Sequence, residues 1–206
     1  ELSARLFSGQ DAQSARAAQS KHDALMVEGA VPPYAIEHLV VEHVPVALQL
    51  PTGRMRGNAH GYTCFMIEGF MDELAHRSGR EPLSYRMAML GHDLRLANCL
   101  QRAASLASWN GAASGSGQGL ACHAMQRLGT EGRIAVIASA RRDEHGIKVD
   151  KLTAVVDIGR IVNIDIARQQ IEGGLVFGLG LATGSSTAYA DGLPLTGRLG
   201  MLGLPL

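Results

Sequence analysis

The sequence predicts an α+β fold in which antiparallel strands pack with several amphipathic helices. Apolar residues recur at helical spacing over about residues 61–108, and β-branched stretches separated by short turns follow over about 119–158. A glycine-rich helical stretch covers about residues 164–182. Because the strands follow one another through short turns, an antiparallel meander is expected rather than β-α-β units.

The composition indicates a chain that can bury a core. It has 206 residues, of which 46% are apolar and 18% charged. Nineteen basic and nineteen acidic residues give a net charge of +0, which disfavours nucleic-acid binding. No stretch reaches the roughly 18 consecutive apolar residues of a membrane span. The three cysteines lack a Cys-x-x-Cys spacing, which argues against a zinc site, an iron–sulfur cluster or a disulfide framework in this chain.

Residues 1–33 are predicted to be a helical or linker lead-in to an α+β region over 34–206. The Ala-, Gln- and Ser-rich residues 1–30 have high helix propensity, and Gly29 is expected to end this surface helix. Two prolines then enforce an extended backbone. The β-branched residues in Tyr34–Val46 predict a strand.

The helical part begins after a polar, glycine-punctuated connection. One face of the helix from Tyr62 is apolar and is expected to face the core; it carries Tyr62, Phe65, Met66, Phe70 and Leu74. Glu68, Asp72 and Glu73 lie on the other face and are interpreted as solvated charges rather than an acid–base pair. Gly79 is expected to end this helix.

Two shorter helices are expected next. Pro82 suits the first turn of a helix that continues over Leu83–Leu90, and Asp93 can cap a third helix over Leu94–Ser108. The Gly- and Ser-rich run that ends at Gly119 is predicted to be a flexible linker. A phosphate loop would need a strand before it and a helix after it, and the predicted order is the reverse.

The strand-rich part has three predicted members and leads into the glycine-rich helix. The strands cover Leu120–Leu128, Arg133–Arg141 and Ile147–Ile158. Asn163 or Asp165 is expected to cap a helix over Ile166–Leu181, and Thr183–Ala190 is a further candidate strand.

Two residues stand out as candidate ligand-binding groups. Arg56 lies on the glycine-flanked connection before the first core helix, where its guanidinium can donate a pair of hydrogen bonds to an anionic or carbonyl-rich ligand. Gln170 lies near the start of a helix with four glycines between positions 173 and 180, each costing roughly 1 kcal/mol relative to alanine. Gly174 and Gly178 share one face, so close packing of another helix explains them equally well. The eight histidines show no metal-ligand spacing.

Two ordered blocks of residues resemble the molybdopterin-binding subunit of the xanthine dehydrogenase/aldehyde oxidase family, and most closely its isoquinoline 1-oxidoreductase branch. The first contains Leu50–Gly57, Phe65–Ala75 and Glu81–Arg86, and the second contains Val156–Asn163, Gln170–Gly174 and Phe177–Gly180. The resemblance runs from about Tyr34 to Gly203.

This resemblance implies a role in a larger enzyme. Members of the family hydroxylate a carbon of an N-heteroaromatic compound or aldehyde with oxygen from water, at a molybdenum centre held by molybdopterin. Electrons leave through 2Fe–2S clusters on a partner subunit. By this resemblance Arg56 and Gln170 are cofactor-binding residues, no residue is a metal ligand, and the partners are the substrate, the iron–sulfur subunit and the rest of the parent chain.

The resemblance also implies what the chain lacks. The catalytic glutamate of the family lies near the subunit's C-terminus, beyond this chain, so no catalytic residue is assigned and the isolated fragment is expected to be inactive. Gly117-Gln118-Gly119 matches a family pterin loop in letters but not in position, and Ile164 replaces the usual proline.

Two alternatives to a role in the cofactor wall remain open from the sequence. One is a structural module whose glycine-rich helix packs on a neighbouring domain. A third hypothesis is an independent enzyme that uses Cys122 or His123. Neither the substrate nor the compartment follows from the sequence.

Overall fold

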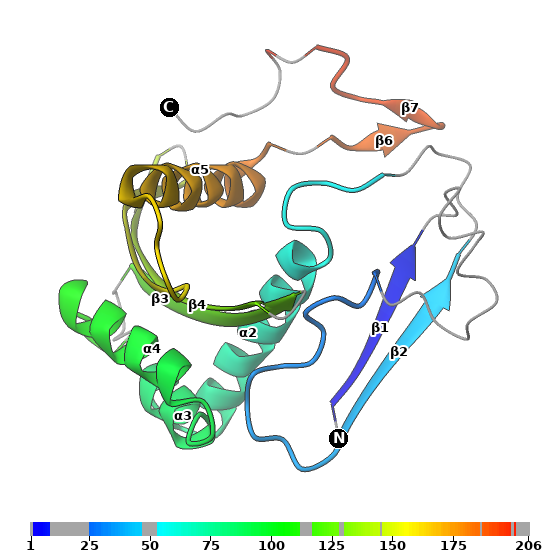
Figure 1. Cartoon of the computed structure of the whole chain (residues 1–206). Helices are drawn as coiled ribbons and strands as arrows, with labels where there is room; N and C mark the ends of the chain where they lie inside the picture. The colour runs from blue at the N-terminus through cyan, green and yellow to red at the C-terminus, as the bar shows by residue number, and fades with distance from the viewer. Residues whose placement is uncertain are drawn as a thin grey trace. The chain divides into compact units, whose positions relative to one another are not determined.

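The structure is a computed structural model, shown in Figure 1, that describes residues 2–8, 25–46, 53–111, 117–127, 130–144, 146–185, 187–198 and 200. The chain divides into two compact units, Glu1–Gly159 and Arg160–Leu206. The boundary that the sequence places between residues 33 and 34 stays a prediction.

The centre of the first unit is a three-stranded antiparallel sheet. Strands β3 (Gln118–Arg127), β4 (Thr130–Asp143) and β5 (Gly146–Asp157) pair in the order β3-β4-β5. Figure 1 shows the sheet as strongly curved, and the register shifts between Ser139 and Ala140. The predicted meander is confirmed, although each strand begins one to three residues earlier than expected.

Three helices precede the sheet, as the sequence predicts. They are α2 (His60–Arg77), α3 (Pro82–Met89) and α4 (Leu94–Leu106). The Asp93 carboxylate accepts a hydrogen bond from the Leu96 amide at 3.0 Å, which confirms the predicted cap of α4. Gly79 adopts φ +64° directly after α2, which confirms the predicted end of that helix.

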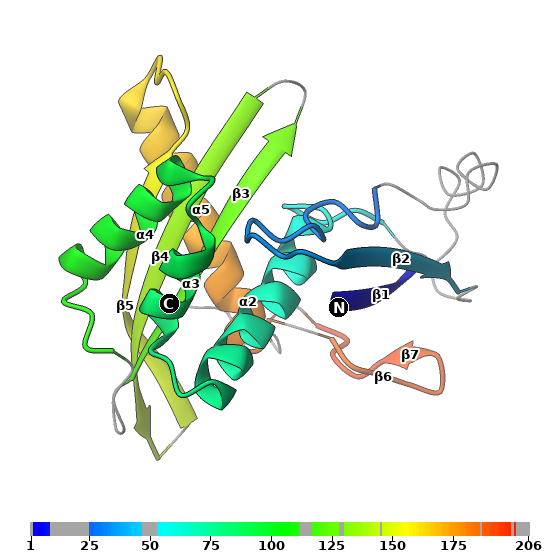
Figure 2. The same cartoon turned by 90° about the horizontal axis from the view of Figure 1, so that it is seen from below.

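The core lies between α4 and one face of the sheet, and Figure 2 shows α4 running along it. Leu96, Leu100 and Ala103 are fully buried on one face of α4. Ala135 and Ile137 are also fully buried, and their register partners on β3 are Cys122 and Leu120. Alternate residues of the sheet therefore meet the helices.

Helix α2 turns most of its predicted apolar face to solvent, although Leu74 of that face packs against the core and Glu73 is exposed as predicted. Phe65 and Met66, predicted to face the core, are 78% and 51% exposed, and Tyr62 and Phe70 are also exposed. Glu68, predicted to be solvated, is only 5% exposed. The prediction was wrong because burial of Glu68 depends on hydrogen-bond donors from other elements, which helical periodicity cannot show.

The N-terminal residues form a strand where the sequence predicts a helix. Strand β1 (Leu2–Ser8) pairs in parallel with β2 (Leu39–Pro45). Its sequence partly alternates apolar and polar residues, a period-two pattern that the helix propensity of the following residues obscured. Residues 9–24 of the predicted helix lie outside the described residues. The predicted strand over 34–46 is shorter, because Tyr34 and Ile36 instead join the core.

The second unit contains the glycine-rich helix α5 (Ile164–Thr183) and the short strands β6 (Tyr189–Ala190) and β7 (Leu193–Pro194). Asn163 accepts hydrogen bonds from the amides of Asp165 and Ile166, so it is the cap among the two predicted candidates. Within the described part of the predicted strand over residues 183–190, Thr183 belongs to α5 and the last two residues form β6.

Candidate functional site

The connection that carries Arg56 is an exposed loop leading directly into α2. It turns through Gly57 at φ +88° and Asn58 at φ +49°, and the Asn58 amide donates to the Met55 carbonyl at 2.9 Å. The side chain of Arg56 lies on the surface. This placement agrees with a donor that meets a ligand from outside the fold.

The base of this loop is held against the turn around residues 25–29. Tyr62 donates its hydroxyl to the Met26 carbonyl at 2.7 Å, and Thr63 donates to the Glu28 carbonyl at 3.0 Å. Gly29 adopts φ +76°, and a Cβ atom there would lie 2.4 Å from Nδ1 of His60. The start of α2 and this turn therefore fit together closely.

A pair of histidines links the start of α2 to β3. Nδ1 of His60 and Nε2 of His123 lie 2.9 Å apart, and the rings meet edge to face. Burial, together with the neighbouring His60, lowers the pKa of His123 to about 4. His123 is therefore neutral near pH 7, which suits one imidazole donating to the other.

Gln170 lies on α5, in the second unit. Its side chain is exposed, as are those of its neighbours Gln169 and Glu172. A Cβ atom at Gly178 of the same helix would meet no atom of the described chain within 4 Å. Part of the glycine-rich surface is therefore open. Arg56 and Gln170 belong to different units, and their roles stay predictions.

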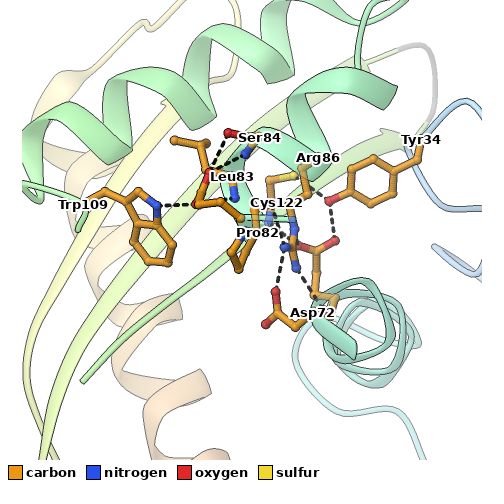
Figure 3. Close-up of polar contacts among 10 residues, drawn as sticks. Tyr34, Asp72, Pro82, Leu83, Ser84, Arg86, Trp109 and Cys122 are labelled. Carbon is orange, nitrogen blue, oxygen red and sulfur yellow. Dashed lines mark hydrogen bonds and ion pairs between the residues drawn. The ribbon is translucent and has the colours of Figure 1, made fainter. Parts of the chain in front are cut away.

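A buried polar cluster in the first unit surrounds Glu68, and Figure 3 shows its contacts. One carboxylate oxygen accepts from Nε of Arg86 at 3.1 Å and from the Cys122 amide at 2.9 Å, while the other accepts from the Tyr34 hydroxyl at 2.7 Å. Arg86 also donates to Asp72 at 2.7 Å. Strand β3 lies at the edge of the sheet, so no neighbouring strand accepts a hydrogen bond from the Cys122 amide. The Glu68 carboxylate accepts it instead.

This cluster is built for stability rather than for nucleophilic chemistry. Burial raises the pKa of Glu68, and the charge of Arg86 opposes part of that rise. Burial also raises the pKa of the Cys122 thiol, and the nearby Glu68 carboxylate adds to that rise. Cys122 is 2% exposed. A buried neutral thiol does not favour the hypothesis of a catalytic Cys122.

A cavity of about 700 Å³ lies between residues 29–33, His60 and the turn before α4. Its charged side chains are already paired: Arg133 donates to Asp93 at 2.6 Å, and Arg95 donates to both oxygens of Asp157 at 2.8 and 2.7 Å. Hydrogen bonds from Arg95 lower the pKa of Asp157 to about 2. These ion pairs hold α4 against the ends of β4 and β5.

Comparison with known proteins finds a family match for the second half of the chain. Residues 111–206 match the family model of the molybdopterin cofactor-binding domain. The recognition made from the two motif blocks is therefore confirmed, and so is the α+β fold class.

Two curated proteins extend the relationship beyond this domain. Isoquinoline 1-oxidoreductase subunit beta of Brevundimonas diminuta is 26% identical over 141 residues, covering 68% of this chain and 18% of the relative. A membrane-bound aldehyde dehydrogenase (pyrroloquinoline-quinone) of Gluconacetobacter polyoxogenes is 28% identical over 165 residues, covering 71% of this chain and 21% of the relative. The chain thus spans about a fifth of the length of either protein.

Two further findings concern metal ligands and membrane-spanning helices. Within the described ranges, no group of three or more His, Cys, Asp or Glu side chains is arranged to hold a metal ion. No helix of the described part is both long and apolar enough to cross a bilayer.

Sequence reasoning singled out Arg56 and Gln170, whose roles stay predictions, and it missed the buried cluster around Glu68. It treated Glu68 and Asp72 as one solvated pair, whereas Arg86 holds the first in the core and the second at the surface. Arg86 is the fifth residue of a short helix and gave no separate indication, because an arginine on a helix is normally exposed.

Proposed function

We propose that this chain forms part of the molybdopterin-binding wall of a larger oxidoreductase that hydroxylates a carbon of an N-heteroaromatic compound or an aldehyde. The family match over residues 111–206 is the observation that carries the proposal. One relative is named an isoquinoline oxidoreductase subunit and the other an aldehyde dehydrogenase, and the second name also prints pyrroloquinoline-quinone. The substrate is therefore proposed only as a class.

The described residues offer donors of the kind that molybdopterin needs. The exposed guanidinium of Arg56 can donate two parallel hydrogen bonds to an anionic oxygen, such as one on the phosphate of the cofactor. The exposed amide of Gln170 can both donate and accept, as the edge of a pterin ring requires. When bound, the cofactor supplies the molybdenum centre at which water-derived oxygen is transferred.

The roles of this chain's residues in the proposal are binding and orientation. Arg56 is fixed by a loop whose base is tied to the turn at residues 25–29, and Gln170 is fixed within the first turns of a capped helix. No catalytic base is assigned within this chain. A partner subunit with 2Fe–2S clusters would carry electrons away, which agrees with the naming of one relative as a subunit.

The decisive experiment uses the full-length parent protein. We expect Arg56→Ala and Gln170→Ala to lower the molybdenum and pterin content of the purified protein and to lower its turnover with N-heteroaromatic or aldehyde substrates. Exposed residues supply matched controls: Arg77→Ala for the arginine and the adjacent Gln169→Ala for the glutamine. Unchanged cofactor content and rate in both test variants would contradict the site assignment.

A second function is favoured by exposed apolar side chains. Phe65 and Met66 on α2 and Val176 on α5 are more than half exposed. Such faces are typical of surfaces that another protein segment covers. In this alternative the chain is a structural or assembly module without direct cofactor contact. A parent structure in which Gln170 is buried against protein and far from the pterin would favour it.

A further inference from the structure

The loop that carries Arg56, at residues 53–59, lies directly beside the turn at residues 25–29. Both segments line the same cavity, whose volume is about 180 Å³. The turn precedes both of the motif blocks, and it lies outside the family match at residues 111–206. The family match therefore gives the turn no role, and its position beside the loop suggests one.

Tyr62 connects this turn to the end of the loop. It lies in the first turn of α2, which begins at His60 directly after the loop. Its hydroxyl donates a hydrogen bond to the Met26 carbonyl at 2.7 Å, across 36 positions of the chain. Because the loop runs directly into this helix, the hydrogen bond fixes the place where the loop ends.

The loop transmits the position of its end to Arg56. Gly57 and Asn58 adopt φ +88° and +49°, and the Asn58 amide donates to the Met55 carbonyl at 2.9 Å. This closed turn contains Arg56 and leaves its backbone few conformations. The direction in which the exposed guanidinium leaves the surface therefore depends on where the loop is anchored.

Two further contacts join the same segments but lie inside the fold. Thr63, 2% exposed, donates to the Glu28 carbonyl at 3.0 Å, and Gly29 fits closely against His60. Changes there would disturb the packing of α2 as a whole. Tyr62 is 39% exposed, so its hydroxyl can be removed while the core stays intact. Anchoring of the loop can therefore be separated from folding at Tyr62.

We propose that Tyr62 is a positioning residue for Arg56, and that the turn at residues 25–29 belongs to the cofactor site as the support of the loop. The inference rests on the proposed function, in which Arg56 binds the cofactor. A loop that is free before binding loses conformational entropy when the ligand orders it. A loop that is already anchored avoids much of that cost, so the hydrogen bond to Met26 strengthens cofactor binding without touching the cofactor.

The first measurement follows the loop in the chain without cofactor. Hydrogen–deuterium exchange of peptides covering residues 53–63, followed by mass spectrometry, should be about fivefold faster in Tyr62→Phe, as expected when a hydrogen bond of ordinary strength is lost. Peptides from α4 should exchange at unchanged rates. Tyr189→Phe, at an exposed tyrosine of β6, is the matched control and should leave both sets unchanged. Unchanged exchange at residues 53–63, or equal acceleration of both sets, would overturn the proposal.

The second measurement asks whether Tyr62 acts through Arg56. In the full-length parent protein, Tyr62→Phe should raise the rate of pterin release about fivefold. The same change should have no effect in a parent that already carries Arg56→Ala, because the positioned side chain is then absent. Equal effects of Tyr62→Phe in the two backgrounds would show a general structural role and would overturn the inference while the proposed function stands. Unchanged cofactor content in Arg56→Ala itself would instead contradict the proposed function, and this inference with it.

Discussion

The histidine pair shows how a single buried side chain can make stability depend on pH. His60 begins α2 and His123 lies on β3, so their hydrogen bond joins two elements of the first unit. Burial lowers the pKa of His123 to about 4 from an ordinary value near 6.5. The folded chain therefore keeps His123 neutral where the unfolded chain protonates it.

We predict that the free energy of unfolding falls as the pH decreases from about 6.5 to 4. Over this range the unfolded state binds a proton at His123 that the folded state does not, so the contribution is complete above pH 6.5 and is lost on acidification. The loss is at most roughly 3 kcal/mol. Urea unfolding followed by circular dichroism at a series of pH values measures it.

The same series with His123→Gln identifies the residue responsible. The variant should show a shallower decline between pH 6.5 and 4, while His38→Gln, at an exposed histidine, should follow the unaltered chain. An equally steep decline in His123→Gln would assign the pH dependence to other groups. Asp157, whose pKa hydrogen bonds from Arg95 lower to about 2, contributes mainly below pH 4.

At the scale of elements, the Glu68–Arg86 ion pair joins α2, α3 and the edge of β3. Arg86 is fully buried, and its guanidinium also donates to the backbone carbonyl of Glu68 at 2.9 Å. Removal of one partner of a buried ion pair leaves the other charge without compensation, which costs more than the intact pair contributes. The packing of these three elements therefore depends on both residues being present.

We predict that Arg86→Met lowers the free energy of unfolding by about 3–5 kcal/mol, because Glu68 would keep its burial and lose its main partner. The double variant Glu68→Gln/Arg86→Met should be more stable than Arg86→Met alone. Arg77→Met, at the exposed end of α2, should change stability by no more than about 0.5 kcal/mol. A loss below 1 kcal/mol for Arg86→Met would contradict a structural role for the pair.

These elements show which features the sequence can and cannot predict. The cap at Asp93, the stop at Gly79 and the three-stranded meander follow from local rules, and all are confirmed. The orientation of α2 is different, because both of its faces carry large side chains and only the partners across the fold select one. The hydrogen bond from Tyr62 to Met26 is likewise invisible in sequence, since it joins two segments that meet in space.

At the scale of the whole molecule, the exposed apolar side chains of α2 bear on the proposed assembly function. Tyr62, Phe65, Met66 and Phe70 are exposed on this helix, while its inner face holds the buried cluster. Such a group of apolar side chains gains nothing from exposure to water. The chain also spans about a fifth of the length of its curated relatives. The exposed face supports the proposed assembly function.

We predict that Phe65→Ser affects the parent protein and not the isolated chain. The side chain is 78% exposed in this structure, so the free energy of unfolding of the chain should change by no more than about 0.5 kcal/mol. In the parent, where a neighbouring segment would cover it, the same change should lower the melting temperature by several degrees. Leu106→Ser, at an exposed residue at the end of α4, is the matched control and should leave both proteins unchanged. Equal melting temperatures of the parent and its Phe65→Ser variant would show that this face stays in water, and the assembly function would then lose its main support.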